Sequence, residues 1–281
     1  ARKQVHQTLG VLVMTGHAGP ELLCAEIENV LDRVLAGELG LDGSVCSALS
    51  AAMGAISEYI NERLRGMPAQ PLHLYPYLRD LLELRKAERI HPADLFAPAS
   101  GRLGLARESL ADLTEEEAKR VRQRFELGVL RLLRSPSDRV AAREILAAID
   151  RVARAPVAAE QQTFWALIAV YFRALAEGHG ELDVYGKRLL ARLNLQLRRT
   201  LTDGAPAAEK LQRDVLFSIA RMRPASDELR RVFEVFDLHG KVPGDIESPR
   251  YGQVDRRAQQ ALAQAVTRMK KSWESMLQNP G

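Results

Sequence analysis

Aromatic residues and cysteines are both scarce in this sequence of 281 residues. Aromatics make up 5% of the chain, and the two cysteines are Cys24 and Cys46. Two thiols are too few for a disulfide framework or a four-thiolate zinc site. Runs of β-branched and aromatic residues are also rare, whereas the helix formers Leu, Ala, Arg and Glu dominate. These features argue against a sandwich, a barrel or an α/β sheet and predict an all-α protein.

The sequence also lacks a large excess of charge of one sign. It has 40 Lys and Arg against 36 Asp and Glu, a formal net charge of +4. Such a balance implies no strong affinity for polyanions, so we expect no nucleic-acid partner. No stretch has 18 consecutive apolar residues and no signal peptide is recognisable, so we expect no membrane insertion and a cytoplasmic location. Because the sequence opens with Ala1 in a helical pattern, we interpret it as a fragment of something longer.

Motifs of the common nucleotide-dependent and metal-dependent enzymes are missing. The sequence contains no P-loop, no GxGxxG after a strand, and no HExxH, CxxC or GxSxG. Its six histidines are scattered, and none forms a helical i, i+4 metal pair. We therefore expect no cofactor, no metal site and no ATP-binding catalytic domain within this chain.

Residues 1–90 are predicted to form four helices joined by short loops. Glycines and prolines separate blocks in which apolar residues recur at helical spacing. In the first block, the residues expected to face inward are Val5, Leu9, Leu12 and Val13, and in the third block Met53 is among them. The helices are expected at about 3–16, 20–36, 44–64 and 75–85, which suggests an antiparallel four-helix bundle.

Residues 91–281 are predicted to form a linker followed by a second all-helical domain. Residues 91–110 carry turn signals without helical periodicity, and we expect this linker to pack through Leu95 and Phe96. A capping box, Thr114 with Glu117, then opens the second domain over 111–281. Its helices are expected at about 114–133, 138–153, 160–177, 183–202, 207–221, 226–236 and 254–277.

Two side-chain patterns in the second domain have ordinary structural interpretations. One helix carries an aromatic stripe that we expect in the core, formed by Phe164, Trp165, Tyr171 and Phe172. Another carries arginines interleaved with leucines at core spacing, and we interpret these arginines as a solvated face: Arg188, Arg192, Arg198 and Arg199. Aromatic residues for base stacking are scarce and the net charge is small, which again disfavours nucleic-acid binding.

The stretch His6-Gln7-Thr8-Leu9-Gly10 lies in the first predicted helix, and Glu28 follows His6 by 22 residues on the second. This combination resembles the histidine box of histidine phosphotransfer domains, His-x-x-Lys-Gly with a glutamate on the neighbouring helix. An imidazole can attack phosphorus with one nitrogen while a carboxylate holds the proton of the other. Gly10, one turn further on, leaves space for a docking kinase or receiver domain. The resemblance thus implies catalytic roles for His6 and Glu28 and a binding role for Gly10.

The resemblance extends beyond this box, to the stretches Leu74–Leu81 and Asp94–Pro98. Together they are similar to the N-terminal region of type IV pilus chemosensory hybrid histidine kinases, which are ChpA/PilL-like and CheA-related. Residues 110–240, for example Lys187–Arg199, resemble the helical region that follows there. The resemblance implies two-component signalling that controls pili and twitching motility. The implied partners are a kinase core, response-regulator receiver domains and pilus regulatory proteins.

Two functional hypotheses stay open. In the first, the chain is a non-catalytic signalling region of such a kinase, with His6 as phosphoryl acceptor. In the second, it is a degenerate phosphotransfer-like scaffold that only docks partner proteins. The second is favoured by Leu9, which stands where the family carries a lysine.

The spacing of His6 and Glu28 makes a geometric prediction. The turn at Gly16–Gly19 lies about midway between them, so in an antiparallel hairpin the two side chains are at the same height. We therefore predict that His6 is partly exposed and that Glu28 lies within hydrogen-bonding distance.

Overall fold

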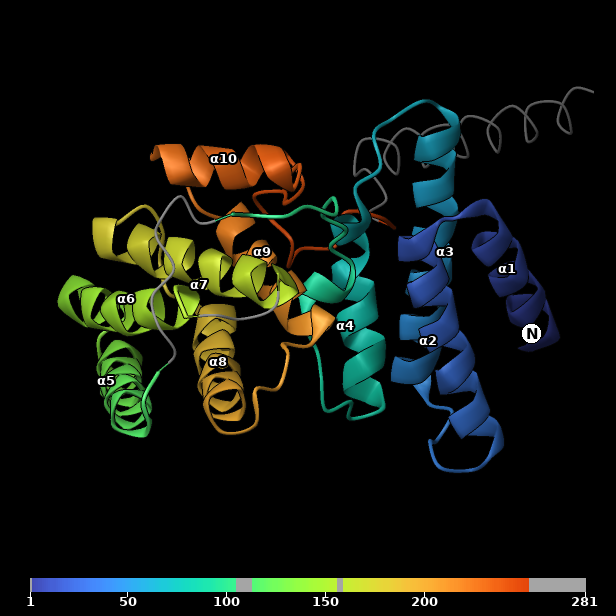
Figure 1. The fold of residues 1–281 in the computed structure, drawn as a ribbon. Helices are drawn as coiled ribbons and strands as arrows, with labels where there is room; N and C mark the ends of the chain where they lie inside the picture. The colour runs from blue at the N-terminus through green and yellow to red at the C-terminus, as the bar shows by residue number, and fades with distance from the viewer. Residues whose placement is uncertain (1, 105–112, 156–158, 253–281) are drawn as a thin grey trace, which may run out of the picture. The chain divides into compact units, whose positions relative to one another are not determined.

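The computed structural model describes residues 2–104, 113–155 and 159–252 (Figure 1). Within those ranges the chain forms ten α-helices and no strand, which confirms the all-α prediction. The helix expected over 254–277 lies outside the described residues. The chain divides into two compact units, each described by itself below. Of the described residues, 2–69, 76–87 and 247–252 cluster as the N-terminal unit, and 70–75, 88–104, 113–155 and 159–246 as the second unit. The expected boundaries of folding domains, 1–90, 91–110 and 111–281, stay a prediction.

The N-terminal unit is built on an antiparallel hairpin of two helices. Its elements are α1 (Arg2–Thr15), α2 (Ala18–Leu35), α3 (Gly43–Leu64) and α4 (Tyr75–Leu84), whose first residue clusters with the second unit. The first two helices lie side by side (Figure 1). Gly16 ends α1 with a φ of +70°, a conformation that favours glycine, and the His17 N–H donates to the Leu12 carbonyl. This compact turn fixes how α1 and α2 face each other.

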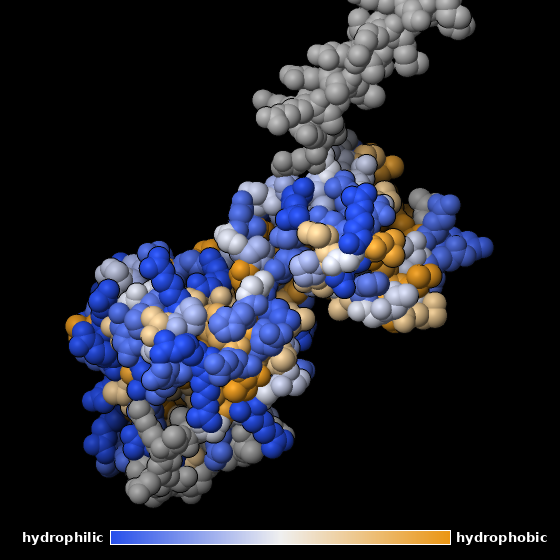
Figure 2. All heavy atoms as spheres, turned by 90° about the horizontal axis from the view of Figure 1, so that it is seen from above, coloured by the Kyte–Doolittle hydropathy of each residue, from blue (hydrophilic) through white to orange (hydrophobic). Residues whose placement is uncertain are grey.

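The packing of α1 is one-sided. Val5 and Leu12 are buried, whereas Val13, predicted to face inward, is 53% exposed. The prediction for Val13 was wrong because α1 packs mainly along α2, and Val13 lies outside that contact. On the side of α3 an open groove of about 790 Å³ remains, which Val11 lines and Val13 does not. Most side chains that line the groove are apolar, among them Met53, which is also exposed although it was expected in the core. Figure 2 shows such apolar groups at an otherwise mainly hydrophilic surface.

A late segment of the chain completes the N-terminal unit. The Tyr251 N–H donates to the Tyr77 hydroxyl at 2.6 Å, and the Tyr251 hydroxyl donates to Glu62 of α3 at 2.9 Å. Arg79 of α4 pairs with Glu247 at 2.9 Å. These contacts join residues about 170 positions apart in the sequence, so helical periodicity gave no sign of them.

The second unit packs six α-helices around aromatic side chains. They are α5 (Glu115–Arg134), α6 (Arg139–Ala153), α7 (Ala159–Glu177), α8 (Val184–Asp203), α9 (Glu209–Ala220) and α10 (Asp227–Val235). Short 3-10 turns occupy Pro71–Leu74 and Pro92–Asp94. The predicted capping box at Thr114 and Glu117 is formed at the start of α5. The aromatic stripe of α7 is fully buried as predicted, which places α7 at the centre of this unit.

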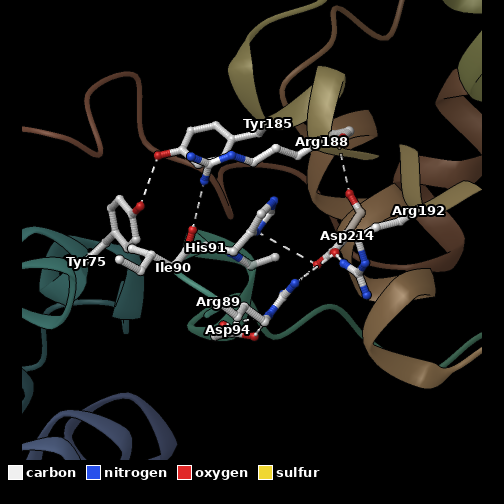
Figure 3. A network of polar contacts seen from close by, with 11 residues as sticks. Tyr75, Arg89, Ile90, His91, Asp94, Tyr185, Arg188, Arg192 and Asp214 are labelled. Atoms are coloured by element: carbon white, nitrogen blue, oxygen red, sulfur yellow. Dashed lines mark hydrogen bonds and ion pairs between the residues drawn. The ribbon is translucent and has the colours of Figure 1, made fainter. Parts of the chain in front are cut away.

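A cluster of charged side chains fastens residues 88–96 to α8 and α9 (Figure 3). Asp214 of α9 is buried and accepts two hydrogen bonds from Arg89, at 2.8 and 3.2 Å. Arg192 of α8 pairs with the same carboxylate, and Asp94 pairs with Arg89 at 3.0 Å. Leu95 and Phe96 are buried beside this cluster, so the expected packing of the linker through them is confirmed.

The row of arginines on α8 is therefore only in part a solvated face. Arg198 and Arg199 are exposed. Arg192 belongs to the Asp214 cluster, and Arg188 donates to the Ile90 carbonyl at 3.3 Å. Arg188 is nevertheless exposed, as are Arg198 and Arg199. The interpretation as a solvated face was wrong for Arg192 because it considered α8 alone, without the acid on α9.

A glycine of α5, Gly128, lies close against α6. A Cβ added to Gly128 would lie 2.4 Å from Ile145 Cγ1, and Ile145 is fully buried. Added methyl groups in a filled core force neighbouring atoms apart. By contrast, a Cβ on Gly54 of α3 would meet nothing within 4 Å.

We predict that Gly128→Ala destabilises the protein by roughly 1–3 kcal/mol through overpacking. The matched change Gly54→Ala should instead be neutral or stabilising by up to about 1 kcal/mol, because alanine favours helix over glycine. Urea denaturation of both variants measures the difference. Equal effects of the two changes would contradict the described contact between α5 and α6.

His91 adds a neutral group to the charged cluster. Its Nδ1 accepts a hydrogen bond from the Ala93 N–H at 3.0 Å, and its ring packs edge-on against Tyr185 and Phe217. Burial, followed by the positive charge of Arg89, lowers the pKa of His91 from 6.5 to about 4. Protonation would also remove the acceptor that Ala93 uses.

A depressed histidine pKa makes stability depend on pH in acid. The folded state binds fewer protons than the unfolded state between about pH 6.5 and 4, so the free energy of unfolding should fall by roughly 3 kcal/mol across that window. His91→Asn retains an acceptor for Ala93 but does not titrate. Chemical denaturation at several pH values should give this variant a flatter profile, and an unchanged slope would contradict the neutral buried state of His91.

Candidate functional site

The structure brings His6 of α1 and Glu28 of α2 together. His6 Nδ1 lies 2.9 Å from Glu28 Oε1. A carboxylate oxygen only accepts hydrogen bonds, so Nδ1–H donates and Nε2 is left as the basic nitrogen. The imidazole is 71% exposed and the glutamate side chain 13% exposed. The geometric prediction for this pair is confirmed, whereas its chemical role stays a proposal.

Local packing explains why the pair forms at this place. Val5, next to His6 on α1, and Ile27, next to Glu28 on α2, are both buried, and the two helices are in contact. These apolar neighbours fix the rotation of both helices, so the two polar side chains meet at the edge of the contact between them. Cys24 Sγ lies 3.6 Å from the Val5 carbonyl, which shows how closely the helices approach at this height.

An arginine and a second acid extend the pair along the same edge. Arg2, one turn before His6, donates to Asp32, one turn after Glu28, with Nη2 at 3.1 Å from Oδ2. Arg2 Nη2 also lies 3.8 Å from Glu28 Oε1. The hydrogen bond from Arg2 lowers the pKa of the Asp32 carboxyl. Sequence analysis missed both residues, although their offsets of four positions from His6 and Glu28 would have indicated the same faces.

The other positions of the histidine box are open. Gly10 is exposed, and a Cβ placed on it would meet nothing within 4 Å. No steric demand within the described residues therefore requires glycine there. Leu9, where the family resemblance expects a lysine, is half-buried. Lys3 is exposed one turn before His6, so the cations of this face precede the histidine instead of following it.

This arrangement can perform nucleophilic chemistry at Nε2. A neutral imidazole whose Nδ1 proton is held by a carboxylate has a fixed tautomer and a more basic second nitrogen. The high exposure of the ring leaves Nε2 accessible to a group presented by another protein. The site is thus suited to covalent transfer between proteins more than to a small substrate, which needs an enclosing pocket.

The comparison with protein families concerns the other end of the chain. Residues 111–249 match the family model of the FimL scaffold protein second domain. The match spans 139 of the 281 residues and covers α5 to α10. It fits a type IV pilus chemosensory scaffold and does not single out a hybrid histidine kinase. No curated protein and no solved structure matches the chain.

The family match bears on the expected partners. A scaffold of this kind is associated with pilus regulatory proteins, in agreement with the expected class of partners. The described helices include none with the length and apolar character needed to cross a membrane.

The tautomer of His6 is directly measurable. We predict that ¹⁵N NMR of the neutral imidazole shows one dominant tautomer, protonated at Nδ1, because Glu28 accepts that proton. Glu28→Ala should shift the population toward the tautomer protonated at Nε2, which is the more stable one for a free side chain. His17, on the same hairpin, serves as an internal reference whose signals should not change. Identical His6 signals with and without Glu28 would contradict the pair.

Proposed function

We propose that the chain is a signalling scaffold of a type IV pilus chemosensory system in which His6 accepts and passes on a phosphoryl group. The observation that carries the proposal is the 2.9 Å contact between His6 Nδ1 and Glu28 on an otherwise exposed imidazole. The match of residues 111–249 to the FimL scaffold second domain supports the assignment to a pilus chemosensory system. The protein acts in the cytoplasm, where kinase cores and receiver domains are found.

The transfer step is a nucleophilic substitution at phosphorus. The lone pair of His6 Nε2 forms a bond to phosphorus as the bond to the donor breaks, and the leaving group takes that electron pair. Nδ1 keeps its proton, and the positive charge that develops on the ring faces the carboxylate of Glu28. In a second substitution, a carboxylate oxygen of a receiver-domain aspartate forms a bond to phosphorus as the bond from phosphorus to Nε2 breaks, and Nε2 takes that electron pair back. In this proposal a kinase core is the phosphoryl donor, in agreement with the partners that the sequence resemblance implies.

Positive charge near the phosphoryl group comes from the turn before His6. Helical side chains lean toward the N-terminus, so the imidazole of His6 lies over the turn that contains Arg2 and Lys3. Arg2 is already engaged by Asp32, whereas the Lys3 ammonium makes no ion pair with another residue that the structure describes. Lys3 therefore takes the place of the lysine that Leu9 replaces.

A second function is favoured by two observations. Leu9 departs from the phosphotransfer pattern, and the matching family is described as a scaffold. In this alternative the chain docks kinase, receiver and pilus regulatory proteins without accepting phosphate. The exposed surface around Gly10 then serves as a binding face alone.

Phosphorylation with the cognate kinase core and labelled ATP separates the two functions. We predict acid-labile label on the wild-type chain and none on His6→Gln, with His17→Gln labelled as the wild type. Glu28→Ala should be labelled about tenfold to hundredfold more slowly, the range expected for loss of one hydrogen bond to a charged group. Thermal unfolding of each variant checks that the fold persists.

The opposite result has a clear meaning. Equal labelling of wild type and His6→Gln, or no labelling of either by an active kinase core, would exclude His6 as acceptor. If His6→Ala then still recovered the same purified receiver and pilus regulatory proteins in binding assays, the docking function would stand alone.

A further inference from the structure

A groove follows the helical hairpin of α5 and α6 in the second unit, a surface separate from the histidine site. The two helices lie side by side (Figure 1) and pack through Gly128 and Ile145. The groove has a volume of about 910 Å³. Its apolar lining includes Leu127 and Val140, which are 61% and 51% exposed. Exposed apolar side chains along a groove are typical of a surface that another chain covers.

Ion pairs across the hairpin account for both acids of the groove. Glu117 at the start of α5 pairs with Arg151 at the end of α6, at 3.2 Å. Towards the other end, Glu144 pairs with Arg131 at 2.8 Å. Among the residues that the structure describes, no further acid lines the groove. The carboxylates are therefore already neutralised within the hairpin.

Three further arginines of the groove form no ion pair within the part of the chain that the structure describes. Arg120, Arg124 and Arg143 are exposed and line the groove. Arg143 Nε donates to a backbone carbonyl at 3.3 Å, and within the described ranges none of the three forms an ion pair. The groove thus combines apolar side chains with three arginines whose positive charge is not paired by an acid of the described residues.

We propose that this groove binds an acidic amphipathic helix of a partner protein. A helix laid between two antiparallel helices buries its apolar face in the groove, a common mode of peptide recognition. From Val140 to Arg151 the α6 wall is roughly 16 Å long at the rise of an α-helix, enough for about three turns of a partner. Asp or Glu on both sides of the partner's apolar ridge would meet Arg120, Arg124 and Arg143.

The same charges are less suited to nucleic acid. None of the residues that line the groove is aromatic, so bases would find no stacking surface. The apolar side chains of Leu127 and Val140 would form no favourable contact with a phosphate backbone. An acidic helix, in contrast, satisfies the apolar and the charged positions together.

The test uses the full chain and a fluorescent designed peptide of about five helical turns. The peptide carries leucines on one face and glutamates beside them, and its matched control has lysine in place of every glutamate. Fluorescence anisotropy at near-physiological salt should show saturable binding of the acidic peptide and none of the basic one. Circular dichroism of the labelled peptide should show that it becomes helical on binding.

Substitutions then locate the binding site. Arg124→Glu and Leu127→Asp should each weaken binding at least tenfold, roughly the effect of losing a close charge or apolar anchor. The matched controls Arg198→Glu and Leu195→Asp change exposed residues of the same types on α8 and should alter binding less than about twofold. Unchanged unfolding midpoints exclude misfolding as the cause of any loss.

Three outcomes would overturn the proposal. The first is equal binding of the acidic and basic peptides, and the second is equal losses in the groove variants and the α8 controls. The third concerns a single-stranded oligonucleotide: if it bound with loss on Arg124→Glu but not on Leu127→Asp, the groove would be a general polyanion site.

Discussion

The register between α1 and α2 is the constraint on which the histidine site depends. Val5 and Leu12 hold one side of α1 against α2, and the turn at Gly16 fixes how far the two helices are displaced along their axes. A slip of one residue would rotate α1 by about 100° and move His6 away from Glu28. The hydrogen bond between the two side chains is thus a consequence of apolar packing. The pair itself is too exposed to determine the fold.

The two units use charge in opposite ways. In the N-terminal unit, Glu28 holds a proton of an exposed imidazole that is left free to react. In the second unit, Asp214 is buried under arginines, and the neighbouring His91 is kept neutral with its pKa lowered to about 4. Removing one partner of such a buried cluster leaves an uncompensated charge, which is strongly destabilising. The exposed His6–Glu28 pair is suited to nucleophilic chemistry, whereas the buried Asp214 cluster holds residues 88–96 against α8 and α9.

Much of the fold was predictable because local signals dominate it. Apolar periodicity predicted where helices form. The start of α5 was predictable from a capping box, because that motif itself forms the hydrogen bonds that begin the helix. The His6–Glu28 pair was predictable because a single short turn separates its helices. Val13 and Met53 were misplaced because periodicity identifies an apolar face but not whether a neighbour covers it. The Arg89–Asp214 cluster and the Tyr77–Tyr251 contact join distant segments, for which the sequence carries no local pattern.

The central claim is that Nε2 of His6 is a nucleophile prepared by Glu28. It can be tested without any partner protein, by ³¹P NMR of the chain during incubation with phosphoramidate, a small phosphoryl donor. The account predicts one phosphohistidine signal with phosphorus on Nε2, which is missing in His6→Gln and grows more slowly in Glu28→Ala. Phosphorus on Nδ1 of His6 would contradict the account. So would a His6 that reacts no faster than free imidazole under the same conditions.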